Sequence, residues 1–114
     1  NRLRNPDIKL KMDPTLFYRM VENIIKNSLA YTEGKIYIII SNPDNQLIIR
    51  VLDQGCGVDE DIIKRINGED LTNITRHGLG IFISKQIAEL HDGKFSIENK
   101  DQGLDVSFIF DLIN

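Results

Sequence analysis

"HGLGIFISKQIAELHDG", residues 77–93, joins two closely spaced glycines to an amphipathic helix, and it indicates both the layout of the fold and the place of its chemistry. Glycine costs roughly 1 kcal/mol relative to alanine inside a helix. Gly78 and Gly80 therefore need a reason. One alternative is a tight turn leading into the helix. The other is a place where backbone comes close to a ligand, such as a phosphate at the positive end of the helix.

The composition of the chain is that of one soluble domain. Its 114 residues are 41% hydrophobic and 27% charged, so we treat residues 1–114 as a single domain. The net charge of −3 gives no reason to expect nucleic acid as a partner. No charged stripe or exposed aromatic cluster predicts direct membrane contact, and the longest apolar run, residues 36–40, is too short to span a bilayer.

Two details place the chain in a larger context. The single cysteine, Cys56, excludes an internal disulfide or a cysteine-rich zinc site and fits a reducing cytosol. The sequence starts at Asn1 rather than at a methionine, so we expect it to be a piece of a longer protein.

Three helices are predicted. Asp13 as N-cap and Pro14 at the first helical position begin one that stops near Gly34. Apolar or small side chains recur along it at three- and four-residue steps, at Phe17, Met20, Val21, Ile24, Ile25 and Ser28. A second helix is predicted over residues 59–66 and a third over residues 79–91. The residues of the third that we expect to face inward are Leu79, Ile83, Ile87 and Leu90.

The strands are predicted as two hairpins. "KIYIII" and "QLIIRVLD" flank the turn-rich "SNPDN", and "KFSIEN" and "LDVSFIFDLI" flank "KDQG". Residues 8–12 alternate like a short edge strand, and residues 67–77 are polar and read as a loop. The whole predicts an α+β fold, a two-layer α/β sandwich whose mixed, mostly antiparallel sheet is covered on one face by about three helices.

"VENIIKNSLAYT", residues 21–32, carries two asparagines on one side of the first helix, because Asn23 and Asn27 are four residues apart. One interpretation is a solvated flank. The other is that the amide oxygens reach a hard cation whose remaining ligands are phosphates and water, since magnesium typically takes only one or two protein oxygens in such sites.

"DQGCGV", residues 53–58, follows a strand directly. A carboxylate such as Asp53 only accepts hydrogen bonds, so it suits the exocyclic amine of adenine and repels the carbonyl that guanine presents there. Gly55 and Gly57 would let backbone approach a flat ligand. Ordinary turn chemistry after a strand is the alternative. No GxGxxG motif opens a helix here, so a dinucleotide site is excluded.

The order of these three stretches resembles the nucleotide-binding domain of bacterial sensor histidine kinases, a Bergerat fold of the HATPase_c superfamily shared with gyrase, Hsp90 and MutL. "NIIKNSLAYT" resembles the family's N box, "DQGCGV" its G1 box and the opening stretch its G2 box. The tail is similar to the closing strand of the family at Gly103, Phe108, Phe110 and Leu112. The resemblance covers nearly the whole chain.

The resemblance implies a site for ATP and Mg²⁺. Asn27 would be the main magnesium ligand, with Asn23 on the metal or phosphates beside it, and these two would be the catalytic residues. Tyr31 would lie along the adenine or ribose, and Asp53 would bind the adenine amine. Further nucleotide-binding positions come from the two glycine motifs, namely Gly55, Gly57, His77, Gly78, Leu79 and Gly80.

One position separates a kinase from a hydrolase. Relatives that activate water carry a glutamate four residues before the metal-binding asparagine, where this chain has Asn23, which cannot act as a general base. Glu22 is rotated by about 100° around the helix and should point elsewhere. Neither His77 nor His91 occurs in the family's acceptor context. The resemblance thus implies phosphoryl transfer, in trans, to a histidine on a separate dimerisation domain.

The same resemblance implies the surroundings of the domain. We expect a cytoplasmic domain of a membrane-anchored bacterial kinase, whose indirect partner is the receiver domain of a response regulator. Two departures from the pattern favour an alternative, a catalytically weakened nucleotide-binding or interaction module. Ala30 stands where many relatives have Lys or Arg, and Arg76 replaces the first glycine of the G2 box.

Overall fold

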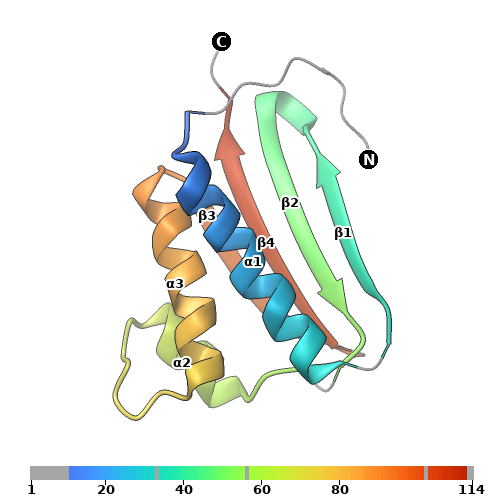
Figure 1. Cartoon of the computed structure of the whole chain (residues 1–114), viewed down its shortest axis with the longest axis vertical. Coiled ribbons are helices and arrows are strands. Elements are labelled where there is room, and N and C mark those ends of the chain that lie inside the picture. Colours follow the sequence, from blue (N-terminus) through green and yellow to red (C-terminus); the bar gives the residue numbers. More distant parts are fainter. Residues whose placement is uncertain (1–10, 33, 56, 102, 113–114) are drawn as a thin grey trace.

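A four-stranded sheet forms one layer of the structure, and three helices cover one of its faces (Figure 1). The computed structural model describes residues 11–112 except positions 33, 56 and 102, and of Tyr31 and His77 it describes the backbone only. The strands lie in the order β1 (Ile36–Ser41), β2 (Gln46–Asp53), β4 (Gly103–Asp111) and β3 (Lys94–Lys100). Every described strand pairing is antiparallel. The predicted sheet is therefore present, but the described part of it contains no parallel pair, which a mixed sheet would have.

The first helix, α1 (Pro14–Tyr31), begins where the sequence predicts. The Asp13 carboxylate accepts hydrogen bonds from the backbone N–H groups of Thr15 (2.8 Å) and Leu16 (3.2 Å). The helix buries Met20, Ile24 and Ser28 against the sheet and the third helix. This inner row holds three of the six residues of the predicted face. The other three, Phe17, Val21 and Ile25, are half-buried and line a surface groove.

The two predicted hairpins are confirmed, and they bring β2 and β4 together in the middle of the sheet. The β1–β2 turn passes through a short helical segment, η1 (Pro43–Asn45), in which Asp44 and Asn45 have positive φ angles of 51° and 62°. The inner faces of the central strands supply much of the core, with Ile49, Val51, Val106, Phe108 and Phe110 all at most 3% exposed. On the outer face, Arg50 and the buried Asp105 form an ion pair of 2.8 Å, and this hydrogen bond raises the pKa of Arg50.

The third helix, α3 (Arg76–Leu90), begins three residues earlier than predicted. The cause is Thr75, whose hydroxyl caps the helix by accepting the Gly78 N–H at 3.0 Å. The polar composition of residues 67–77 concealed this helix start. The second helix, α2 (Glu60–Asn67), agrees with its prediction, and residues 68–75 between the two helices are named the α2–α3 loop.

The predicted inner face of α3 is partly wrong, because Leu79 and Leu90 are 40% and 69% exposed. Ile87 is buried and Ile83 half-buried, whereas the row that meets α1 and the core contains Ile81, Ser84 and Ala88, each 0% exposed. The Ser84 hydroxyl donates a hydrogen bond of 2.8 Å to the Met20 carbonyl oxygen of α1. Small side chains let the two helices approach closely, and a search for large apolar residues misses such a row.

The predicted edge strand at residues 8–12 falls mostly outside the described residues. Its last two members, Lys11 and Met12, have no regular secondary structure.

Two substitutions on α3, one at a buried small residue and one at an exposed leucine, test the orientation of the helix. Ser84→Leu should lower the free energy of unfolding by about 2–3 kcal/mol, because the extra volume overpacks the contact with α1. Leu90→Ser should cost less than about 0.5 kcal/mol, because the leucine is largely solvated already. Urea unfolding of both variants measures the two costs. A larger cost for Leu90→Ser would contradict the observed orientation.

Candidate nucleotide site

Asp53, at the end of β2, is held by hydrogen bonds from three parts of the chain. Its Oδ1 accepts the backbone N–H of Gly55 at 3.0 Å and that of Leu104, on β4, at 3.1 Å. Its Oδ2 accepts the hydroxyl of Ser28, on α1, at 3.0 Å. The carboxylate is therefore fixed in position and orientation, and it is only partly buried.

The remaining capacity of this carboxylate is chemically specific. Two carboxylate oxygens offer about four acceptor positions. Three are used by the described residues, two on Oδ1 and one on Oδ2, so among these residues one position remains on the Oδ2 side. A ligand group at this point must carry an N–H or O–H, as the exocyclic amine of adenine does, because a carbonyl oxygen there would meet only negative charge.

Gly103, opposite the end of β2, keeps Asp53 in place by having no side chain. A Cβ at Gly103 would overlap the Asp53 carbonyl oxygen and come within 2.9 Å of its Oδ1. The φ angle of Gly103 is +112°, which side-chain-bearing residues rarely adopt. The β3–β4 turn and the carboxylate thus require a glycine here.

Asn27 lies on the side of α1 that faces α3. A Cβ built at Gly80 would be 3.8 Å from Asn27 Nδ2 and 3.9 Å from its Oδ1, so the two residues are neighbours across the helix pair. Both Asn23 and Asn27 are half-buried rather than fully solvated. Because Ser28 contacts Asp53 directly, the structure brings Asn27, Asp53 and Gly80 to the same end of α1.

The two glycines of α3 serve different purposes. A Cβ at Gly78 would come within 2.8 Å of Ile74 and 3.1 Å of Ile62, so Gly78 is required by the packing of the α2–α3 loop and α2. A Cβ at Gly80 would make only ordinary contacts, and its protein surroundings therefore do not demand a glycine. Packing therefore explains Gly78, whereas no contact among the described residues requires a glycine at position 80.

The glycines after Asp53 also differ. Gly55 donates its N–H to Asp53, as above. Gly57 has a φ of +78°, and a Cβ there would overlap the Oδ1 of Asn99 on β3. That asparagine accepts the Val58 N–H at 2.9 Å, and its Nδ2 donates to Glu60 at 2.9 Å, so it ties the loop to the sheet. Gly57 is explained by this tie.

The other predicted site residues are less informative. Tyr31 is the last residue of α1 and His77 lies in the first turn of α3, but their side chains are outside the described part. Leu79 projects outward, 40% exposed, next to both glycines of α3.

Sequence reasoning missed the role of Ser28, which it counted only as a small residue on the apolar face. The signal was a buried hydroxyl position next to Asn27, and such a hydroxyl needs a partner. Its partner, Asp53, is 25 residues away, and only the fold brings the two together.

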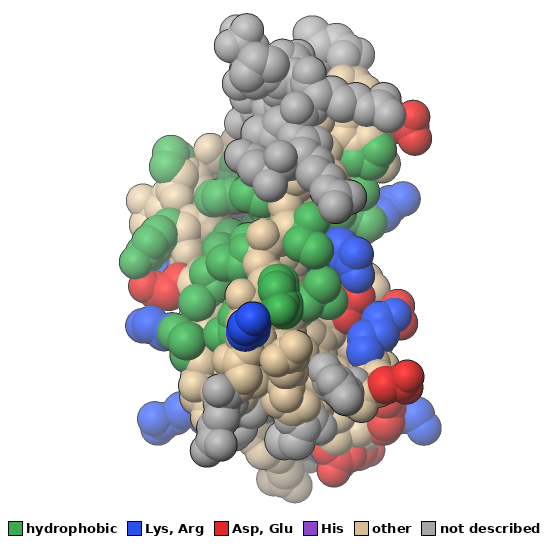
Figure 2. Space-filling view, turned by 90° about the vertical axis from the view of Figure 1, so that its right-hand side faces the viewer, with side chains coloured by type: hydrophobic (Ala, Val, Ile, Leu, Met, Phe, Trp, Pro, Cys, Tyr) green, Lys and Arg blue, Asp and Glu red, His purple; other side chains and the backbone are tan. Residues whose placement is uncertain are grey.

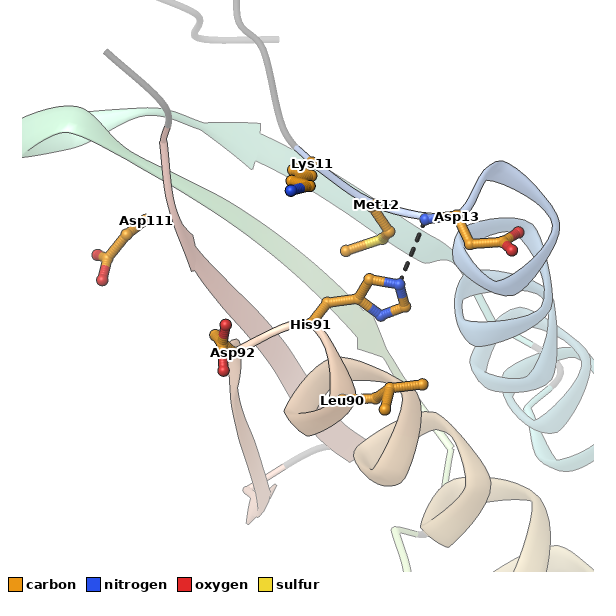
Figure 3. Close-up of a pocket in the computed structure, with 7 residues that line it drawn as sticks. All are labelled: Lys11, Met12, Asp13, Leu90, His91, Asp92 and Asp111. Atoms are coloured by element: carbon orange, nitrogen blue, oxygen red, sulfur yellow. Dashed lines mark hydrogen bonds between the residues drawn. The ribbon is translucent and has the colours of Figure 1, made fainter.

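The hollow of Figure 3 lies at the other end of α1 and has a structural role. There the Nδ1–H of His91 donates to the Ile87 carbonyl oxygen (2.8 Å), and its Nε2 accepts the Asp13 backbone N–H (3.3 Å). The imidazole joins the end of α3 to the start of α1.

A second hollow, the α1 groove, is lined by Phe17, Tyr18, Val21, Glu22, Ile25 and Lys26. Figure 2 shows hydrophobic side chains gathered on this face of the molecule. Glu22 points here: it lies 3.8 Å from Lys26, and its hydrogen bond with Tyr18 raises the pKa of the phenol. It is thus turned away from Asn27, as its place on the helix predicts.

Two features are absent from the described residues. Within the described residues, no three or more His, Cys, Asp or Glu side chains gather in a way that could hold a metal ion. In the same part of the chain, no helix is both long and apolar enough to cross a membrane.

Comparison with known proteins identifies the family. Residues 12–114 match the family described as histidine kinase-, DNA gyrase B-, and HSP90-like ATPase, and the chain belongs to it. The sensor histidine kinase CssS of Bacillus subtilis is 28% identical over 99 residues, which are 86% of this chain and 22% of that protein. The sensor protein KdpD of Clostridium acetobutylicum is 30% identical over 105 residues, covering 84% of this chain and 12% of that one.

Solved structures agree with the fold. The catalytic domain of the histidine kinase ThkA, in a nucleotide-free form, superimposes with a TM-score of 0.79 at 25% identity, covering 96% of this chain and 76% of that one. The chain is therefore an ATPase domain of the histidine kinase type, and it spans less than a quarter of the two sensor proteins named above.

Two glycine substitutions with opposite expected effects test the geometry around Asp53. Gly103→Ala should lower the free energy of unfolding by about 3 kcal/mol or more, because it combines a positive φ with overlap on the Asp53 backbone. Gly80→Ala should raise it by about 0.5–1 kcal/mol, because alanine favours a helix and meets no obstacle. Thermal and urea unfolding measure both. Similar behaviour of the two variants would contradict the described contacts.

Proposed function

We propose that this chain binds Mg²⁺-ATP and donates the γ-phosphoryl group to a histidine on a separate dimerisation domain of the same kinase. The observation that carries the proposal is the fixed Asp53 carboxylate with one acceptor position left, next to the place where Asn27 and Gly80 face each other. The sensor histidine kinases among the relatives support the reaction class.

Adenine recognition follows from the state of Asp53. The carboxylate is oriented before any ligand arrives, so binding requires little reorganisation of this group. It offers acceptors only, which selects adenine against guanine at the exocyclic position. In this proposal two further residues complete the base and ribose side of the site. They are Gly55, whose backbone lies beside the carboxylate, and Tyr31 at the end of α1.

The residues near Gly80 fit a magnesium ion bound mostly by phosphates. The Asn27 side chain lies beside Gly80, with its Nδ2 at 3.8 Å and its Oδ1 at 3.9 Å from the position of a Cβ built there. The described residues hold no acidic cluster that would bind a metal on its own, in keeping with the one or two protein oxygens that magnesium uses in nucleotide sites. Asn27 would be the ligand, with Asn23 one turn earlier. When bound, the metal neutralises charge on the phosphates.

Phosphoryl transfer suits this chain better than hydrolysis. An acceptor imidazole nitrogen would form a bond to the γ-phosphorus while the bond to the β–γ bridging oxygen breaks, and ADP would leave with that electron pair. A positioned acceptor needs no strong base. The position where a water-activating glutamate would stand is Asn23, and Glu22 is engaged with Tyr18 and Lys26 in the α1 groove.

The surroundings of the domain are part of the proposal. Sensor kinases carry further domains, and CssS and KdpD are several times longer than this chain. In this proposal the acceptor histidine belongs to the dimerisation domain, and the present domain lies in the cytoplasm. The receiver domain of a response regulator takes the phosphoryl group in the next transfer step.

Calorimetry with a non-hydrolysable ATP analogue and magnesium tests the site. Wild-type protein should bind the ATP analogue but not GTP. Asp53→Asn should weaken binding at least about 100-fold, because the amide N–H group of asparagine would face the N–H and O–H groups that now donate to the carboxylate. Asn27→Asp should change the magnesium dependence, and Gly80→Ala should weaken binding about 10-fold or more while the fold is kept.

Two controls make these results interpretable. Unfolding curves show whether Asp53→Asn keeps the fold, and Leu90→Ser should leave affinity unchanged.

No binding by wild-type protein at millimolar nucleotide would overturn the proposal and favour the weakened interaction module, to which Ala30 and Arg76 point. If binding is found, radiolabel transfer from ATP to the dimerisation domain of a related kinase separates an active kinase from a binding module.

A further inference from the structure

Lys85 of α3 is a buried lysine between two glutamates. Its side chain is 9% exposed, its Nζ lies 3.1 Å from Glu89 and 3.5 Å from Glu69, and it sits 5.8 Å from the centre of the Phe82 ring. A largely desolvated ammonium group needs compensating charge, because removing it from water is costly. The two carboxylates provide that charge.

The two glutamates belong to different parts of the chain. Glu89 is one turn further along α3, so its contact with Lys85 lies within one helix. Glu69 is the second residue of the α2–α3 loop, so its contact joins that loop to α3. Glu69 also has a φ of +58°, a left-handed conformation that costs a residue with a side chain some energy and persists only where contacts maintain it.

The rest of the α2–α3 loop is held by the elements on either side. Arg65 of α2 pairs with Asp61 at 2.8 Å and donates to the Thr72 carbonyl oxygen. The Asp70 carboxylate accepts the Thr72 N–H at 3.0 Å, and hydrogen bonds from Thr72 hold the pKa of Asp70 below its usual value. The stabilisation that this carboxylate gives the turn is thus fully present above the ordinary aspartate pKa and is lost as the pH falls through the lowered one.

The far end of the loop lies against the candidate site. Ile74 packs where a side chain on Gly78 would stand, and Thr75 caps α3 through the same glycine. Gly80, which faces Asn27, follows two residues later. An eight-residue loop attached at both ends has few conformations available, whereas release of one end increases the entropy that ligand binding must remove.

We propose that Lys85 is a positioning residue, whose ion pair with Glu69 fixes the start of the α2–α3 loop on α3 and so keeps the loop ordered beside the nucleotide site. This inference rests on the proposed function for its effect on nucleotide binding. The order of the loop itself does not depend on that function, so the two can be tested separately.

Glu69→Gln and Glu89→Gln form a matched pair, since each removes one carboxylate from the same ammonium group. Hydrogen exchange without nucleotide should become faster at the amides of residues 69–75 in Glu69→Gln and stay unchanged in Glu89→Gln. The dissociation constant of the ATP analogue should rise about 3- to 10-fold in Glu69→Gln and less than about 2-fold in Glu89→Gln. Lys85→Met should behave like Glu69→Gln, and Lys85→Arg should keep both properties.

Each outcome decides the proposal. Equal effects of the two glutamine variants, or unchanged loop exchange in Glu69→Gln, would overturn it, because Lys85 would then only stabilise its own helix. Faster loop exchange with unchanged affinity would overturn the link to the nucleotide site. If wild-type protein binds no nucleotide, the proposed function fails, and the exchange experiment still decides whether Lys85 orders the loop.

Discussion

The carboxylate of Asp53 is the constraint on which the arrangement of the site depends. It accepts hydrogen bonds from α1 through Ser28, from its own loop through Gly55 and from β4 through Leu104. Helix, strand end and neighbouring strand are therefore fixed relative to one another by a single charged group. In the proposed function the same bonds also orient the carboxylate for a ligand. A structural tie and a selective acceptor would then coincide in one residue.

Close approach of α1 and α3 is the second constraint, and small residues make it possible. Ser84 and Ala88 occupy the inner row of α3, and Gly80 continues that helix towards Asn27. With larger side chains at positions 84 and 88, the helices would separate, and the distance between Asn27 and Gly80 would change with them. The packing that stabilises the domain and the opening that would accept phosphate and metal are consequently parts of one helix pair.

Charged side chains in this domain are divided between different tasks. Arg50 and Asp105 pair on the outer face of the sheet, away from the helices. Glu22 is engaged in the α1 groove, whereas Asn27 lies on the side of α1 that faces α3. Lys85 is buried with two glutamates beside the α2–α3 loop. The proposed site is therefore built from neutral ligands, backbone and one carboxylate, which suits positioning of a phosphoryl donor better than activation of water.

Local sequence signals were sufficient to predict the helices, the strands and the two hairpins, but not the pairing of β2 with β4. The Asp13 cap, the Pro14 start and the alternation in both hairpins are local signals, and local chemistry is sufficient for them. The motif order also predicted that Asn27, Asp53 and Gly80 belong together. The start of α3 at Thr75 rests on a local cap that the polar composition of residues 67–77 concealed. Long-range contacts, in contrast, set the inner row of α3 at Ser84 and the partners of Ser28 and Lys85. These depend on contacts between residues far apart in the chain, which periodicity and propensity do not encode.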